Sequence, residues 1–495
     1  MGVLDLISRR SFVGSSAGAA VAAGLGPAPL RAAERQRHPY TTPHVLRYAT
    51  ASEPGSLNPV LRQEYVLSLI SQLTMAWLFR YDRNNRPVPE LATEIPTKGN
   101  GGISKDGQTL TFRLRKGVVW SDGAPFTAKD VVFSWKVVMD FRNNITSRRG
   151  WDYIKQIDTP DDYTAIFRLT RPFGSFIPTF FGTAGANPCI LPHHVIKDTS
   201  INEAPYNALP IGIGPFKYER WARAQEIVMV ANDKYWRGRP KLDKVIYKLI
   251  PDRNTVLTQL QAHEIDLWAA ATAPYWDRIR AIPGIGTLKQ PGGFFDHLDF
   301  NMQSPLLRER AVREALRYAI DRRKLTDTIY HGVGLVQEPM LSPLYQTADT
   351  SIPLVPFDPN KANALLEGAG WKRGPDGIRA KDGAKLSVSF ATSSGAPDAD
   401  QQIELIRAWW KDVGVDISLR HYPPPMMFAT YQDGGIVYGG KWDVTGFAWL
   451  VPPTGDLQNL YSTAQIPPHG QNDVRYSNPK VDAAFNRFEV EYDVA

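Results

Sequence analysis

The last third of the chain alternates amphipathic helices with short strands, and this alternation most constrains the fold. Asp358 and Pro359 are well placed as the N-cap and first residue of a helix with one apolar face, and two glycines end that helix. A second helix, at 403–412, ends at Gly414, and a strand of alternating apolar residues follows at 415–419. Helices that alternate with strands in this way predict an α/β lobe.

The 495 residues are too many for one ordinary core, so at least two lobes are expected. Alternating and apolar patterns predict strands at 45–49, 109–115, 163–169, 216–221, 226–230 and 245–250. Further helices are expected up to about residue 79, through Leu257 and Leu260, and over 305–320.

Two segments carry strong local structure signals. Thr127 and Asp130 are placed as the N-cap and N3 residues of a capping box, with Phe126 and Val131 positioned as the matching hydrophobic staple. The glycines of 212–216 predict a close backbone crossing.

The N-terminus has the three parts of an export signal. Arg9 and Arg10 precede a soft apolar stretch at 15–30, and small residues follow at Ala32 and Ala33. The pattern predicts a twin-arginine signal over residues 1–33 and a soluble protein in the periplasm. A G-x-S-x-G match at 14–18 lies inside this leader and is rejected as a hydrolase motif, because that motif requires a strand-to-helix turn.

Composition excludes several classes of protein. The formal net charge of +7 comes without a Lys/Arg run, so nucleic acid is not an expected partner. The single cysteine, Cys189, excludes an intramolecular disulfide, a Cys-cluster metal site and a lipid anchor on an N-terminal cysteine. His193 and His194 are adjacent and match no metal motif, so no metal and no cofactor are expected.

Several blocks in order resemble the family 5 extracellular solute-binding proteins, the peptide/nickel/opine-binding group of ABC importers. They run from about residue 45 to 485 and include 52–59, 114–133, 212–216, 232–240, 264–267, 311–322 and 358–371. His263 stands where the family tends to have glycine; if this position needs a positive φ, histidine is tolerated there but costs more than glycine.

The resemblance implies a bilobal periplasmic-binding-protein fold of type II, in which a hinge joins two lobes and the first lobe carries an inserted subdomain. Residues 40–80 and 208–295 would form the first lobe, 81–207 the insert, and 296–495 the second lobe. Relatives usually run further, so the C-terminal return to the first lobe is expected to be missing.

The resemblance also implies that the ligand lies between the lobes. Glu53 and Ser56 match the family's first-lobe loop at the cleft, and Phe447 and Trp449 match its second-lobe loop. Peptide-binding relatives place an aspartate soon after this tryptophan to receive the ligand's ammonium, and the first acid here is Asp456. Alternatively, Glu53 is an ordinary loop carboxylate, Ser56 forms a turn and Trp449 belongs to the core. A further alternative is a ligand without a fixed ammonium.

The predicted function is capture of a small ligand, a di- or oligopeptide, by a monomer that delivers it to ABC importer permease subunits. Such a protein is not an enzyme. Three alternatives stay open: an exported hydrolase acting on carbohydrate, the same fold binding an oligosaccharide, opine or chelated nickel, and a sensory protein that loads a receptor.

Overall fold

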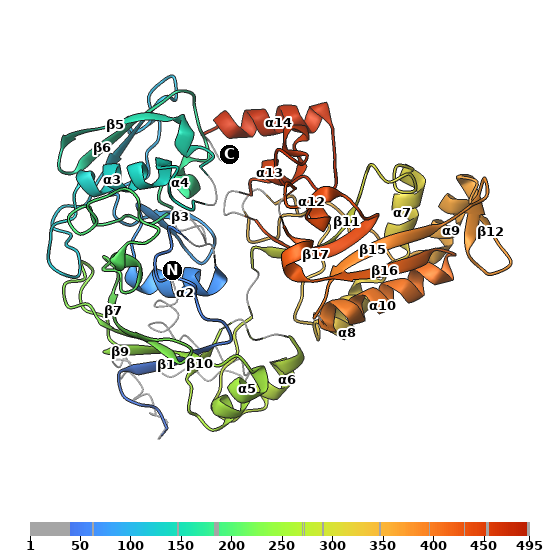
Figure 1. Ribbon diagram of the computed structural model, residues 1–495, viewed down its shortest axis with the longest axis horizontal. Coiled ribbons are helices and arrows are strands. Elements are labelled where there is room, and N and C mark those ends of the chain that lie inside the picture. Colours follow the sequence, from blue (N-terminus) through green and yellow to red (C-terminus); the bar gives the residue numbers. More distant parts are fainter. Residues whose placement is uncertain are drawn as a thin grey trace, which may run out of the picture.

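The structure is a computed structural model that describes residues 40–492 except 62–63, 146–147, 183–187, 270, 272, 290–291, 346–347, 396, 430 and 452–454. Two lobes of mixed helix and strand lie side by side (Figure 1), so the prediction of a bilobal α/β fold is confirmed. No helix among the described residues is long and apolar enough to span a membrane. The predicted export signal lies outside the described residues.

The first lobe is built on a five-stranded sheet with the strand order β10-β1-β9-β8-β7. β1 is parallel to β9 and β10, whereas β7, β8 and β9 form antiparallel pairs. Helix α2 packs on one face of the sheet, and α5 and α6 pack on the other. The elements are β1 (Val45–Thr50), α2 (Tyr65–Thr74), β7 (Phe216–Ala222), β8 (Glu226–Ala231), β9 (Lys244–Leu249), α5 (Arg253–Gln261), β10 (Leu267–Trp268) and α6 (Trp276–Arg280).

The inserted subdomain, between α2 and β7, surrounds a three-stranded antiparallel sheet in the order β4-β6-β5. Its core is largely aromatic, with Phe112, Trp120, Phe126 and Phe167 fully buried. The predicted capping box is confirmed, since Thr127 N–H donates to Asp130 Oδ2 at 2.9 Å. The elements are β2 (Phe79–Tyr81), β3 (Pro87–Pro89), β4 (Thr109–Arg113), α3 (Ala128–Met139), η1 (Trp151–Tyr153), β5 (Ile154–Asp161), β6 (Thr164–Leu169), α4 (Phe176–Thr179) and η2 (Pro205–Asn207).

The predicted glycine crossing passes over the C-terminal end of α2. Gly214 N–H donates to the carbonyl oxygen of Thr74 at 2.9 Å, and Ser121 N–H donates to that of Gly212 at 3.0 Å. A Cβ added at Gly214 would lie 2.5 Å from the carbonyl oxygen of Leu73, which is closer than real Cβ atoms approach. The helix expected up to about residue 79 therefore ends at Thr74, because Gly214 of the crossing segment donates its N–H to the carbonyl oxygen of that residue.

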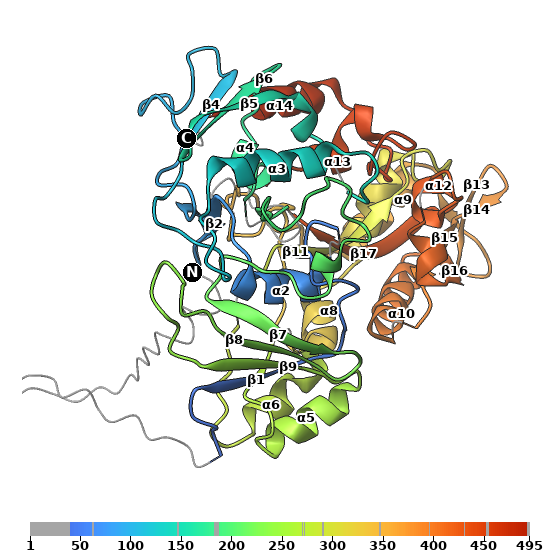
Figure 2. The ribbon, with the colours of Figure 1, turned by 60° about the vertical axis from the view of Figure 1, so that its left-hand side comes forward.

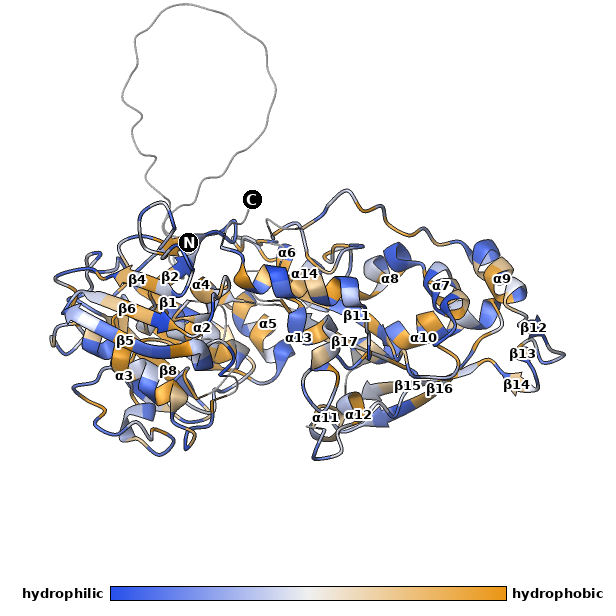
Figure 3. Ribbon diagram, turned by 90° about the horizontal axis from the view of Figure 1, so that it is seen from above, coloured by the Kyte–Doolittle hydropathy of each residue, from blue (hydrophilic) through white to orange (hydrophobic). Residues whose placement is uncertain are grey.

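The second lobe holds a four-stranded sheet in the order β11-β17-β15-β16. β15 is parallel to β16 and β17, and β11 is antiparallel to β17. Helices α7 to α10 share an apolar core with this sheet, and along them Figure 3 shows both orange and blue residues, as expected of helices with one buried face. The elements are β11 (Phe294–Phe300), α7 (Arg310–Tyr318), α8 (Arg322–Ile329), α9 (Pro359–Gly368), β15 (Ser387–Ser393), α10 (Pro397–Asp412), β16 (Asp416–Tyr422) and β17 (Val444–Leu450).

Short elements complete this lobe. They are β12 (Lys372–Arg373), β13 (Arg379–Lys381), β14 (Ala384–Lys385), α11 (Pro424–Met427), α12 (Ile436–Gly439), α13 (Gln458–Tyr461), η4 (Thr463–Gln465) and α14 (Pro479–Val490); η3 (Ala273–Tyr275) belongs to the first lobe. The predicted cap of α9 is confirmed, since Lys361 N–H donates to Asp358 Oδ1 at 2.9 Å. The helix expected over 305–320 begins only at Arg310.

The chain's last described residues cross back to the inserted subdomain, so the expectation of a missing C-terminal return was wrong in this respect. Figures 1 and 2 show α14 beside that subdomain. Gly174 N–H donates to the carbonyl oxygen of Glu489 at 2.7 Å, and Tyr492 Oη donates to that of Gly107 at 2.6 Å. The Glu489 carboxylate, 6% exposed, lies 2.6 Å from the Arg171 guanidinium. These contacts anchor the end of the second lobe on the insert.

Candidate ligand-binding site

The loop after β1 carries the two first-lobe residues of the predicted site. Glu53 Oε1 accepts a hydrogen bond from Trp221 Nε1 at 3.0 Å and lies 3.8 Å from the Arg223 guanidinium. Ser56 Oγ accepts from Asn58 N–H at 3.0 Å, as in a serine turn. Within the described residues, both side chains therefore have their polar partners in the first lobe.

β17 presents the two predicted aromatic residues on one side of the second-lobe sheet. Phe447 and Trp449 are two positions apart, so both point to the same face, and their ring centroids lie 5.1 Å apart. On β11 their cross-strand partners are His297 and Phe295. These four half-buried rings form one surface, which we call the aromatic face (Phe295, His297, Phe447 and Trp449). Phe428 packs edge-on against it.

Asp456, shortly after β17, points to the inserted subdomain. Its Oδ2 lies 3.3 Å from Arg149 Nη1, and its side chain is only 12% exposed. Asp456 Oδ1 also accepts the backbone N–H of Gln458 at 2.9 Å. The same guanidinium donates to the side-chain oxygens of Gln458 at 2.5 Å and Asn459 at 3.4 Å. The residue predicted to receive a ligand's ammonium group thus already holds a cation of the protein itself.

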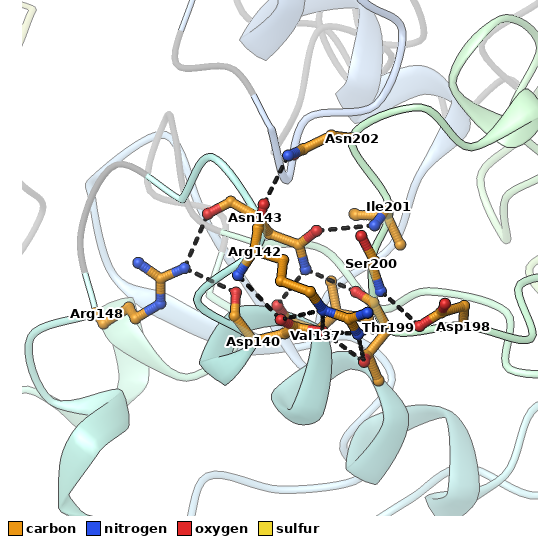
Figure 4. Close-up of polar contacts among 10 residues, drawn as sticks. All are labelled: Val137, Asp140, Arg142, Asn143, Arg148, Asp198, Thr199, Ser200, Ile201 and Asn202. Atoms are coloured by element: carbon orange, nitrogen blue, oxygen red, sulfur yellow. Dashed lines mark hydrogen bonds and ion pairs between the residues drawn. The ribbon is translucent and has the colours of Figure 1, made fainter.

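A hydrogen-bond network at the end of α3 holds Arg148, the residue before Arg149 (Figure 4). Arg148 donates to the carbonyl oxygens of Asp140 at 3.0 Å and Asn143 at 2.9 Å. Asn143, 4% exposed, in turn donates to the carbonyl oxygen of Thr199 at 2.6 Å. The network thus anchors the residue next to Arg149, whose own side chain reaches Asp456 of the second lobe.

A cavity of about 1150 Å³ lies beside β11 and is lined by second-lobe segments, including α7, α8 and α14. Asp299 lines it, and Asp299 Oδ2 pairs with His297 Nε2 at 2.9 Å. Burial and the charge of Asp299 raise the pKa of the Asp473 carboxyl well above its usual range. Phe295 and His297 of the aromatic face line this cavity, whereas its lining includes none of the five residues predicted from the sequence, Glu53, Ser56, Phe447, Trp449 and Asp456.

Sequence reasoning missed Arg149, Phe295 and His297. The alternation of residues 294–300 is a strand signal that could have revealed the last two. Arg149 has no local signal, because its partners Asp456 and Asn459 lie 307 and 310 residues later in the chain. No hydrogen bond or ion pair joins Glu53 or Ser56 to the second-lobe residues within the part of the chain that the structure describes.

The chain is similar to several characterised proteins along most of its length. It is 27% identical to the oligopeptide-binding protein AppA of Bacillus subtilis (strain 168) over 446 residues, which are 87% of this chain and 78% of the relative. It is 28% identical to the dipeptide-binding protein of Escherichia coli (strain K12) over 379 residues, 73% of this chain and 68% of the relative.

Solved structures agree with the fold. AppA from Bacillus subtilis in complex with a nonapeptide superposes with a TM-score of 0.72 at 25% identity, covering 91% of this chain and 87% of that one. NikA from Brucella suis in complex with Fe(III)-EDTA gives a TM-score of 0.79 at 22% identity, covering 91% and 88%.

The family model of the bacterial extracellular solute-binding proteins, family 5 middle, matches residues 86–468. This span includes the inserted subdomain and most of the second lobe, and with it Arg149, the aromatic face and Asp456. The chain belongs to the family 5 extracellular solute-binding proteins, which bind the substrates of ABC importers and are not enzymes.

Proposed function

We propose that this substrate-binding protein captures a small peptide between its lobes and delivers it to the permease. The observation that carries the proposal is the Arg149–Asp456 ion pair. In this pair the carboxylate of Asp456, which is mostly buried and lies just beyond the aromatic face, binds a cation that the inserted subdomain supplies across the lobe boundary. A peptide's α-ammonium offers the same charge and hydrogen-bond donors as the guanidinium. The oligopeptide and dipeptide names of two relatives support this ligand class.

In this proposal the Arg149 guanidinium occupies, in the ligand-free protein, the position that the ligand's α-ammonium takes in the complex. The arriving α-ammonium takes its place on Asp456, Trp449 and Phe447 cover the adjoining side chain, and Glu53 and Ser56 close the site from the first lobe. A ligand that touches both lobes only in the closed form favours that form, because it binds the closed form more tightly than the open form. Apolar burial and a few hydrogen bonds suffice for micromolar binding, about −8 kcal/mol.

The lobes that close would be 40–80 with 208–295, which carries the insert 81–207, and 296–495. The protein would act as a monomer, because one chain carries all five proposed contact residues. The sheets support this division to within two residues: β1 pairs with β9 and β10 of the first lobe, whereas β11, which begins at Phe294, pairs with β17 of the second.

Export through the twin-arginine pathway to the periplasm, without a lipid anchor, belongs to the same proposal and rests on residues 1–33. Replacing Arg9 and Arg10 by lysine should leave the full-length protein in the cytoplasmic fraction, whereas the unaltered protein should be recovered from the periplasm. Equal export of both proteins would contradict the assignment of the pathway.

The binding test is calorimetric titration of residues 40–495 with di- to pentapeptides and with the same peptides acetylated at the N-terminus. Oligosaccharides, opines and nickel chelates form the comparison set. Free peptides should bind at least about tenfold more tightly than acetylated ones, since a lost charged hydrogen bond costs about 1.5–3 kcal/mol. In the Asp456→Asn variant this difference should shrink.

Equal affinity for free and acetylated peptides would remove Asp456 from the site while keeping the peptide proposal. Tight binding of a sugar, opine or chelate without any binding of peptides would overturn the peptide proposal and leave the family assignment intact.

A further inference from the structure

Three side chains with metal-binding atoms meet in the inserted subdomain, far from the proposed peptide site. One donor atom from each of Asp130, His193 and His194 lies within 4.8 Å of the other two. Asp130 is fully buried at the start of α3, and its Oδ1 is 2.7 Å from His193 Nδ1. The two imidazole rings meet edge to face, with centroids 6.1 Å apart. Two adjacent histidines thus face one buried carboxylate.

The second histidine has a buried nitrogen without a partner. His194 Nε2 lies 2.8 Å from Asp122 Oδ2. A carboxylate at neutral pH has no proton to give, so Nε2 carries the hydrogen and donates it. Nδ1 is then left with a free lone pair, and the structure shows that this atom is buried and makes no hydrogen bond. An unpaired buried acceptor is unfavourable, and a cation would satisfy it.

We propose that Asp130, His193 and His194 bind a divalent transition metal ion of the Zn²⁺ type. Neutral imidazole and carboxylate are ligands that such ions prefer. Three protein ligands leave a fourth position for water, and the 36% exposure of the His193 side chain leaves a path from solvent. Asp122 takes the second-shell role, since a carboxylate that accepts from the far nitrogen of a ligating histidine fixes its tautomer.

Metal binding at His193 requires a change of tautomer. In the structure His193 Nδ1 donates a proton to Asp130 Oδ1. When Nδ1 and the carboxylate bind the ion, the neutral imidazole carries its proton on Nε2, while the backbone N–H of His193 keeps its 3.1 Å bond to the same oxygen. Asp130 Oδ2 continues to accept from Thr127, so the capping box of α3 is retained. Because the ion binds unprotonated imidazole and carboxylate groups, binding should strengthen with rising pH.

The ion would join two segments of the insert, the first turn of α3 and the segment at 188–196, and His194 links it to the turn at 120–125 through Asp122. A histidine paired with an aspartate elsewhere provides the comparison. His421 Nε2 lies 2.8 Å from Asp400 Oδ1, the same separation as in the His194–Asp122 pair. Within the described part of the chain, His421 and Asp400 belong to no group of three possible metal ligands. The pair therefore serves as a comparison that lacks the second histidine.

The test is calorimetric titration of the tag-free mature protein with Zn²⁺, which gives the affinity and the number of ions bound. The decisive variant is His194→Gln, whose amide N–H₂ can still donate to Asp122 but which has no nitrogen in place of Nδ1. It should bind Zn²⁺ at least about tenfold more weakly, and Asp122→Asn about 10- to 100-fold more weakly. His421→Gln should bind as the unaltered protein does.

One equivalent of Zn²⁺ that binds more weakly in both His194→Gln and Asp122→Asn would support the site. No binding, or equal affinity in the unaltered protein and both variants of the pair, would overturn it. If His194→Gln does not fold, Asp122→Asn decides by the same comparison. The result is independent of peptide binding, because no residue of this group belongs to the proposed peptide site.

Discussion

Arg149 of the inserted subdomain and Asp456 of the second lobe form an ion pair across the lobe boundary, with 3.3 Å between Nη1 and Oδ2. The contact is one part of a larger junction, in which Glu489 accepts from both Arg149 and Arg171. Both groups of the pair are mostly shielded from solvent, so salt screens their attraction less than it would on the surface. In the proposed site, the pair would therefore affect both lobe closure and the access of a ligand to Asp456.

Arg149→Ala should shift the ligand-free protein toward the open form. Ion pairs of this kind contribute about 0.2–1 kcal/mol, so the open-to-closed ratio should rise by about 1.4- to fivefold. Small-angle scattering of the ligand-free protein should show a larger radius of gyration than that of the unaltered protein.

The same substitution should strengthen peptide binding if Arg149 competes with the ligand for Asp456. Arg168→Ala is the matched control, because Arg168 of the same subdomain forms an ion pair with Asp158 at 2.9 Å and neither residue belongs to the proposed site. An unchanged radius together with unchanged affinity in Arg149→Ala would refute both roles of the pair.

Trp449→Ala should weaken ligand binding by about tenfold or more, since large aromatic residues dominate binding energy at contact sites. Trp409→Ala is the control, because Trp409 is a half-buried tryptophan that packs on the helical core of the same lobe. Calorimetric titration with the best-binding peptide compares the two. Equal losses in both variants would mean that Trp449 acts through the stability of the lobe and not through contact with the ligand.

Local chemistry explains which parts of the fold could be predicted. The capping box at Thr127 and Asp130 and the cap at Asp358 depend on residues a few positions apart, and the structure confirms both. His263 has a φ of 57°, which is the case in which histidine costs more than the glycine typical of the family. Such features need only neighbouring residues, so one sequence is enough to read them.

Long-range contacts explain what could not be predicted. The partners of Arg149 lie in the second lobe, and Asp130 meets His193 across 63 residues. The C-terminal return depends on Glu489 reaching Arg171, 318 residues earlier in the chain. No local pattern marks such pairs, because they form only when separate elements pack together.

Asp473→Asn should stabilise the protein increasingly as the pH rises. The folded-state pKa of Asp473 is raised by burial and by Asp299, so the folded state keeps a proton that the unfolded chain loses above about pH 4. The stability linked to this proton is fully present below the unfolded pKa and is lost as the pH rises through the folded one. Asparagine can still donate to Asp299 but does not titrate.

Urea unfolding of both proteins between about pH 5 and about pH 8 tests this. The gap in unfolding free energy between the variant and the unaltered protein should widen with pH, and the exposed Asp416→Asn should produce no such trend. A constant gap would show that Asp473 is already ionised in the folded protein.

Gly214→Ala should destabilise the first lobe by about 3 kcal/mol, because overpacking at a site that cannot yield is costly. The added Cβ would meet the backbone of Leu73 and Thr74, which the end of α2 holds in place. Gly286→Ala is the control, because a Cβ at Gly286 meets no atom within 4 Å, and its effect should stay below about 1 kcal/mol. Thermal unfolding followed by circular dichroism compares the variants. Equal melting temperatures for Gly214→Ala and the unaltered protein would show that the crossing can move away from α2, and that the glycines of 212–216 are not required by the close approach.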